Sequence, residues 1–272
     1  MAATYLPAFL TALVEGLTEF VPVSSTGHMI LFGDLIGFVG EKAESFTVFI
    51  QLGAILAAFL IYKERFFGLI PTHTQGGFFK NLFWGQSRPT ASHFIAACLP
   101  ISLVGLVLYK IIKEQLFSVE VVAIGLIVGG VLMILIELLP NKRFSAEALE
   151  QISLKQAFLI GLGQCMAIWP GMSRSGSTMV TSLLVGVKHR AAADFSFIVA
   201  VPVMVAAVGY DLYKSWHLLE TADAGYFALG FFTAFGVAWL SIRWFLTVLA
   251  RLGLIPFGIY RILVGGLVLW LY

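Results

Sequence analysis

Apolar residues form long, nearly uninterrupted runs along most of the chain. A helix needs about 20 mostly apolar residues to cross about 30 Å of hydrocarbon. Six stretches meet that length, at residues 45–62, 91–109, 119–139, 191–212, 225–248 and 253–272. The pattern predicts an all-α polytopic membrane protein with six transmembrane helices.

Two further apolar regions, residues 4–36 and 154–186, are interrupted near their middle. The interruptions are SSTGH at residues 24–28 and SRSGST at residues 173–178, each shortly after a proline. Each half is too short to span a bilayer, and non-helical backbone at membrane depth survives only where protein or a wet cavity covers it. We therefore predict two re-entrant helix-loop-helix hairpins, each returning to the side from which it enters.

The basic residues orient this arrangement. The first lysine or arginine is Lys42, so little holds the N-terminus inside, and we place it outside. With both hairpins re-entrant, eleven lysines and arginines fall inside and four outside, which fits the positive-inside rule. The same course predicts that the C-terminus also lies outside.

The two halves of the chain, residues 1–139 and 154–272, repeat one order of elements at an offset of about 149 residues. FTVFIQLGAILAAFLIY at residues 46–62 aligns with FSFIVAVPVMVAAVGYD at residues 195–211. Because the two hairpins enter from opposite sides, the halves form an inverted-topology repeat within a single integral membrane domain, residues 1–272. Sites in such repeats lie where broken helices meet near the midplane, so the two polar tips are expected to converge.

Composition excludes several classes of protein. The chain is 59% hydrophobic and only 12% charged, about half the charge of a soluble domain. Its net charge of +2 and the absence of a basic run argue against nucleic-acid binding. Cys98 and Cys165 match neither metal nor redox spacing, so we expect them to pack in the membrane, and no P-loop motif is present.

The first tip carries two carboxylates, Glu15 and Glu19, spaced to share one helix face. Carboxylates at membrane depth need a cation, a proton or water, and paired oxygen ligands suit Mg²⁺ or Ca²⁺. We predict a divalent cation at Glu15 and Glu19. A structural pair of these glutamates with Arg174, without metal, is the alternative.

Three hydroxyl residues, Ser24, Ser25 and Thr26, open the next half-helix, whose free amides attract anions. Ordinary N-capping is the alternative. We predict that Ser25 is a nucleophile with His28 as its general base or acid, and that Ser24 and Thr26 bind substrate. Attack by water activated by His28 or Glu19 is left open.

The second tip carries Arg174, whose planar fork suits phosphate oxygens. Ser173, Ser175 and Thr178 are predicted to bind substrate beside it, although a ligand-free ion pair with a glutamate would also satisfy the arginine. Taken together, the tips fit phosphoryl transfer. The predicted catalytic residues are Ser25, His28, Glu19 and Arg174. Elsewhere, Glu137 and Arg261 are expected to form a structural or interfacial pair.

At these residues the sequence resembles the undecaprenyl-diphosphate phosphatase family, the bacitracin-resistance membrane proteins. EGLTEF followed by SSTGH occupies residues 15–28, and PGMSRSGST occupies residues 170–178. The resemblance implies hydrolysis of the terminal phosphate of undecaprenyl diphosphate, which regenerates the carrier lipid of peptidoglycan synthesis. It also implies a divalent cation, and a site in the bacterial inner membrane that opens to the periplasm. The family's motif residues fall on Glu15, Glu19, Ser24, Ser25, His28, Ser173, Arg174 and Thr178.

A lipid-phosphate flippase is the competing function, because inverted repeats with broken helices are also a transporter architecture. The expected partners are the polyprenyl diphosphate lipid and the bilayer, with no nucleic acid. The oligomeric state is left open, a homodimer included.

Overall fold

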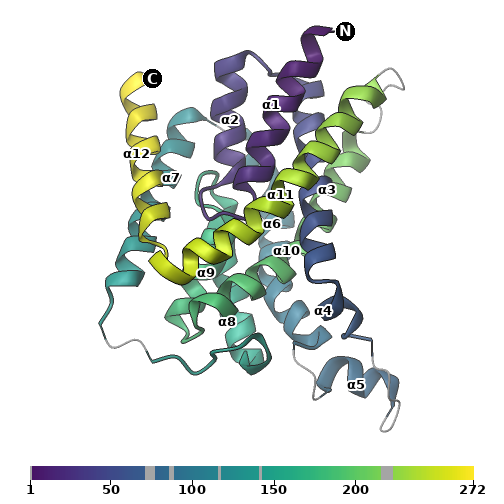
Figure 1. The fold of residues 1–272 in the computed structure, drawn as a ribbon, viewed down its shortest axis with the longest axis vertical. Coiled ribbons are helices and arrows are strands. Elements are labelled where there is room, and N and C mark those ends of the chain that lie inside the picture. The colour runs from purple at the N-terminus through teal and green to yellow at the C-terminus, as the bar shows by residue number, and fades with distance from the viewer. Residues whose placement is uncertain (1, 71–76, 86–88, 116–117, 141–142, 216–222) are drawn as a thin grey trace.

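The computed structural model describes residues 2–70, 77–85, 89–115, 118–140, 143–215 and 223–272. These residues form α-helices and two short 3-10 helices (Figure 1), and within the described ranges no strand occurs. In chain order the elements are α1 (Ala2–Thr18), α2 (Ser25–Ile36), α3 (Glu41–Ile61), α4 (Lys63–Phe67), α5 (Phe78–Trp84), α6 (Ala91–Gln115), α7 (Val119–Leu138), η1 (Leu149–Gln151), α8 (Leu154–Gln164), η2 (Cys165–Ile168), α9 (Arg174–Leu184), α10 (His189–Ser215), α11 (Ala224–Leu252) and α12 (Ile255–Leu271).

Most of the predicted spans coincide with long apolar helices. Within the described residues, five helices are long and apolar enough to cross a membrane: α3, the Ala91–Leu108 part of α6, α7, the His189–Lys214 part of α10, and α11. The sixth predicted span is α12, whose 17 residues rise about 26 Å, short of the roughly 30 Å of a hydrocarbon core. The all-helical, multi-spanning organisation is confirmed, whereas the count of six spans is not.

Both interrupted regions are helix-loop-helix hairpins. The first hairpin consists of α1 and α2, which pack against each other, and the second consists of α8, η2 and α9. In Figure 1 the turn between α1 and α2 lies deep in the molecule, far from the N-terminus. Their re-entrant course through a bilayer stays a prediction.

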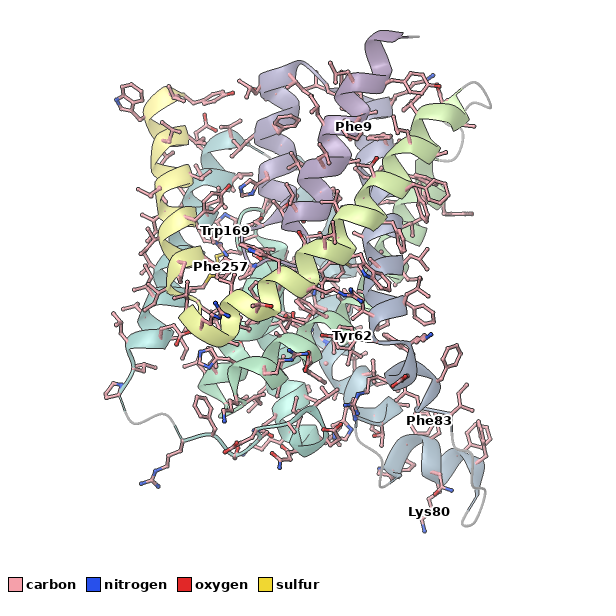
Figure 2. All side chains as sticks on the ribbon, in the orientation of Figure 1. Phe9, Tyr62, Lys80, Phe83, Trp169 and Phe257 are labelled. Carbon is pink, nitrogen blue, oxygen red and sulfur yellow. The ribbon has the colours of Figure 1, made fainter. Side chains whose placement is uncertain are left out.

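The two chain ends lie at the same end of the molecule (Figure 1). Helices α4 and α5 lie at the opposite end, where Figure 2 labels Lys80. A common side for the two termini is therefore compatible with the predicted topology. Which side of a membrane that is stays a prediction.

Helix packing is compatible with the predicted repeat, which stays a prediction. In that repeat α1 corresponds to α8, α3 to α10, α6 to α11 and α7 to α12. Two of these counterparts pack directly on each other, α7 on α12 and α3 on α10, and the packing of α1 on α11 is matched by that of α8 on α6. Such pairing is what two halves related by a pseudo-two-fold axis produce.

The junction between α11 and α12 redirects the end of the chain. Helix α11 has 29 residues, about 44 Å of rise, and runs obliquely across the molecule (Figure 1), as a helix longer than the bilayer does by tilting. It ends at Leu252 and is followed by Gly253, whose φ of 62° is readily adopted only by glycine. Pro256 then lies in the first turn of α12, where its missing N–H is no loss.

Small residues let α7 and α12 approach closely. A Cβ added at Gly130 would lie 2.6 Å from the carbonyl oxygen of Gly258, and one added at Gly258 would lie 2.7 Å from that of Gly130. Close backbone approach of this kind is the common way to pack helices in lipid, where burial of apolar surface gives no advantage. The crossing fixes α12 beside the loops of both hairpins.

Candidate active site

The tips of the two hairpins use the same backbone device. Ser24 and Ser173 have φ values of 73° and 72°, and they are the non-glycine residues with positive φ in the described part of the chain. Each serine hydroxyl caps a half-helix by accepting the N–H of the glycine three residues later, at 3.3 Å for Gly27 and 3.1 Å for Gly176. The two serines are 149 residues apart, which equals the offset of the predicted repeat. Backbone strain of this kind clusters at functional sites.

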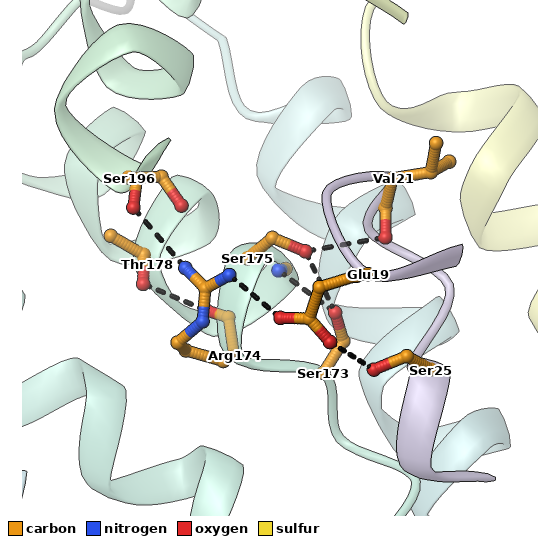
Figure 3. A network of polar contacts seen from close by, with 9 residues as sticks. Glu19, Val21, Ser25, Ser173, Arg174, Ser175, Thr178 and Ser196 are labelled. Atoms are coloured by element: carbon orange, nitrogen blue, oxygen red, sulfur yellow. Dashed lines mark hydrogen bonds and ion pairs between the residues drawn. The ribbon is translucent and has the colours of Figure 1, made fainter. Parts of the chain in front are cut away.

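The two tips meet through an ion pair (Figure 3). Arg174 Nη2 donates to Glu19 Oε1 at 3.0 Å, with side chains that are 12% and 7% exposed. Beside it, the Ser175 hydroxyl donates to the Val21 carbonyl oxygen at 3.3 Å. The predicted convergence of the tips is thus confirmed.

Arg174 is held by protein groups on several sides but keeps one free donor. It begins α9, donates from Nη1 to the Ser196 carbonyl oxygen at 3.1 Å, and lies 5.8 Å from the centre of the Phe20 ring. Its buried Nε has no hydrogen-bond partner among the described residues. A buried donor without an acceptor is unfavourable, so this atom is suited to an oxygen of a bound anion.

The carboxylate of Glu19 joins the arginine to a serine. Ser25 Oγ donates to Glu19 Oε2 at 2.5 Å, while Oε1 accepts from Arg174 (Figure 3). Ser25 therefore has a proton acceptor in contact with its hydroxyl, which is the geometry that an activated nucleophile requires.

The expected pair between Ser25 and His28 is not formed. His28 Nδ1 lies 2.8 Å from the Ser24 carbonyl oxygen and Nε2 lies 2.8 Å from the Tyr260 hydroxyl, with the two rings stacked at 5.6 Å. Side chains on a helix lean back toward its N-terminus, which brings the imidazole of His28 over the Ser24 carbonyl. The Ser25 hydroxyl donates to Glu19 instead of contacting the histidine. Tyr260 could not be anticipated, because it comes from α12.

A cavity of about 210 Å³ lies between the tips. Gln51 and Met204, about halfway along α3 and α10, also line it, so it lies near the mid-depth of these long helices. A larger cleft of about 430 Å³ between α3 and α11 is lined mainly by phenylalanines and is separate from this chemistry. The predicted site residues that line the cavity are Glu19, Ser24, Ser25, Thr26, Ser173 and Arg174.

Two predicted substrate-binding hydroxyls are engaged elsewhere. Ser175 is directed to the first tip, as described above, and Thr178 Oγ1 donates to the Arg174 carbonyl oxygen at 2.7 Å. Both residues are buried and neither lines the cavity. Thr178 bonds to the turn that carries Arg174, because one helical turn brings residue 178 under residue 174. Ser175 attaches the same turn to the first tip.

A family model described as the bacitracin resistance protein BacA matches residues 8–267. The chain belongs to the BacA family. BacA proteins are known for phosphatase activity and bacitracin resistance. The match covers both hairpins and almost all of the helices that position them.

The divalent cation expected in a BacA protein can be tested against Glu15. This residue is fully buried one turn before Glu19, and neither of its carboxylate oxygens has a hydrogen-bond partner among the described residues. Mg²⁺ is commonly held by one or two carboxylates together with substrate phosphates, so the two glutamates fit such an ion. No group of three or more His, Cys, Asp or Glu that could hold a metal occurs within the described residues. Further ligands would therefore come from substrate oxygens.

The expected pair between Glu137 and Arg261 is wrong. Glu137 Oε1 accepts from His189 Nε2 and from the backbone N–H of Leu254, both at 2.7 Å. The carboxylate lies at the end of α7, next to the α11–α12 junction, whereas Arg261 lies farther along α12 and its guanidinium contacts the glycines of α7. Glu137 thus holds three elements together at one end of the molecule.

Proposed function

We propose that this BacA protein is an undecaprenyl-diphosphate phosphatase, which removes the terminal phosphate and leaves the lipid monophosphate used in peptidoglycan synthesis. The observation that carries the proposal is the Glu19 carboxylate, which contacts both the Ser25 hydroxyl and Arg174 at the wall of one cavity. A nucleophile, its proton acceptor and an anion clamp are the groups that phosphoryl transfer needs.

Binding of the diphosphate would depend on positive groups from both hairpins. Arg174 offers its free Nε, and the first turns of α2 and α9 offer backbone N–H groups at the positive ends of helix dipoles. Ser24, Thr26 and Ser173 add hydroxyls at the cavity wall. These donors suit an anion with many oxygens.

The reaction proceeds in two displacements. Ser25 Oγ attacks the terminal phosphorus as its proton passes to Glu19 Oε2, and the bond from that phosphorus to the bridging oxygen breaks, releasing the lipid monophosphate. The lipid monophosphate leaves with the proton that Glu19 took up. Water then attacks the phosphoserine and gives a proton to Glu19. As the bond from phosphorus to Ser25 Oγ breaks, Glu19 passes that proton to Oγ, which restores the serine and releases inorganic phosphate. Arg174 stabilises the charge on the transferring phosphoryl oxygens in both steps.

Glu15 and Glu19 would hold a divalent cation, which when bound supplies positive charge to the phosphoryl oxygens. The orphaned oxygens of Glu15 support this assignment. For orientation, we propose that the end carrying both termini faces the periplasm of the bacterial inner membrane, since most basic segments then lie inside.

Phosphate release from undecaprenyl diphosphate by the purified protein in detergent tests the proposal. We expect release that is lost with a chelator and restored by Mg²⁺ or Ca²⁺. A flippase would release none, because detergent leaves no second compartment, and that result would overturn the phosphatase assignment. Phosphate release that is unchanged by the chelator would contradict the proposed cation but would still support the phosphatase reaction.

A further inference from the structure

A second buried arginine, Arg261 of α12, contacts the loops of both hairpins. It is 0% exposed and does not line the cavity. Its Nη1 donates to the Pro22 carbonyl oxygen at 3.2 Å and its Nη2 to that of Gly171 at 2.7 Å. Bonds from Nε to Leu126 and from Nη2 to Gly125, both at 3.2 Å, attach the same guanidinium to α7.

The two loop carbonyls are equivalent in the repeat. Pro22 precedes the capping serine of the first hairpin by two residues, and Gly171 precedes that of the second by two residues. One guanidinium therefore holds corresponding points of both tips, while α7 fixes the guanidinium itself. This geometry sets the separation between Ser25 and Arg174, each of which begins the half-helix just beyond its loop.

Arginine is an energetically unfavourable choice for simply joining two loops inside a fold. Removing its charge from water is unfavourable unless its donors are well satisfied, and here the acceptors given above are neutral carbonyls. What arginine provides is a rigid planar fork that binds several acceptors at fixed angles, which the single ammonium of lysine does not.

Given the phosphatase activity proposed above, we propose that Arg261 is a positioning residue that fixes the two tips relative to each other, so that Ser25 and Arg174 address the same phosphoryl group. It acts through Pro22 and Gly171 and does not touch the substrate.

Gly129 on α7 offers a second way to disturb this contact. A Cβ added there would overlap the guanidinium of Arg261, whose atoms are the nearest three neighbours. Because the guanidinium is the mobile end of a long side chain, Gly129→Ala should displace it while Arg261 itself is kept. Alanine is also the better helix former, so the substitution favours α7.

The experiment compares Arg261→Lys and Gly129→Ala with matched controls, Arg243→Lys and Gly266→Ala. Arg243 is exposed on α11, and a Cβ added at Gly266 meets nothing within 4 Å. For each purified variant, kcat and KM for phosphate release and the thermal unfolding midpoint are measured. We expect kcat to fall by about 10²-fold in both test variants, as displacement of reacting groups by about 1 Å does, with KM changing less. The thermal unfolding midpoint should fall below that of the controls, because the buried guanidinium loses acceptors, but should stay above the assay temperature.

The double variant separates positioning from general stability. Both substitutions act through one guanidinium, so the combined loss of kcat should be no larger than the greater single loss. Wild-type kcat in the folded single variants would overturn the proposal. So would failure of both variants to fold, since Arg261 would then be a requirement of the fold. If the wild-type protein releases no phosphate, the proposed function fails instead, which is a separate result.

Discussion

The two hairpin tips share one backbone and differ in chemistry. Ser25 and Arg174 occupy corresponding positions, each directly after a capping serine with positive φ and each the first residue of a half-helix. In one hairpin this position holds a hydroxyl, and in the other it holds a cation. The comparison teaches that a single repeated arrangement can place a hydroxyl and a guanidinium, the nucleophile and the anion clamp that we propose, at one contact, because the halves meet tip to tip.

The surroundings of these two positions extend the difference. The first hairpin brings two carboxylates, Glu15 and Glu19, on one helix face just before its tip. The second hairpin brings no carboxylate to the contact, and its helix α9 is largely buried. The Glu19 carboxylate of one half and the Arg174 guanidinium of the other thus meet at the cavity. Each neutralises a buried charge of the other that would be unfavourable alone.

Removal of the proposed nucleophile should have the largest effect. Ser25→Ala leaves no group to form the phosphoserine, and we expect kcat to fall by on the order of 10⁴-fold or more, as loss of a nucleophile does in other hydrolases. Ser182→Ala is the control, because Ser182 only donates to the Thr178 carbonyl within α9. Near-full turnover by Ser25→Ala, measured as phosphate release, would show that water attacks directly.

Loss of the arginine at the corresponding position should come next. Arg174→Ala removes the clamp on the phosphoryl oxygens, and we expect kcat/KM to fall by on the order of 10³-fold. Arg243→Ala, which removes an exposed arginine of α11, should leave phosphate release unchanged. If both variants behaved alike, Arg174 would not contact substrate and the two tips would not share the reaction.

The contact of Glu19 with the Ser25 hydroxyl predicts that Glu19, and not His28, acts as the base. Glu19→Gln keeps the shape of the side chain but not its basicity, and we expect kcat to fall by about 10²-fold or more. His28→Gln should lower kcat less, because His28 contacts Ser24 and Tyr260 rather than Ser25. Steady-state kinetics of the two variants test this order. If His28 were the base, His28→Gln would lower kcat more than Glu19→Gln does.

The smallest effect concerns the shared backbone. Ser24→Ala and Ser173→Ala each remove the side-chain acceptor of one half-helix, and each should destabilise the protein by about 1 kcal/mol. Because the two capping serines have similar φ values and make the same type of hydrogen bond, we expect similar shifts in thermal unfolding. A large shift of the unfolding midpoint in only one variant would mean that the two capping hydrogen bonds, although they occupy corresponding positions, contribute differently to stability.

Much of the fold follows from local patterns. The apolar runs locate five of the helices to within a few residues, and the polar breaks after Pro22 and Pro170 locate both tips. The count of spans did not follow in the same way, because α12 is shorter than the apolar run that predicts it. The break at Gly253 was itself predicted, since the sixth predicted span starts at residue 253, but the 17-residue length of the helix that follows was not.

The site divides in the same way. The residue types at the tips, and the convergence of Arg174 with Glu19, could be predicted, because buried charges in a membrane must find partners. The partner of the Ser25 hydroxyl could not, nor could the contacts of His28, Thr178 and Arg261. These depend on where side chains from separate helices point.

By itself, the sequence determined that the chain is a helical membrane protein whose two polar tips carry complementary charges, because the hydrophobic pattern and the cost of burying charge act locally along the chain. Only the tertiary structure decided that the Ser25 hydroxyl donates to Glu19 rather than to His28, and that Arg261 joins the loops instead of pairing with Glu137. Hydrogen bonds form within about 3 Å, and residues more than a hundred positions apart reach that distance only once the helices have packed.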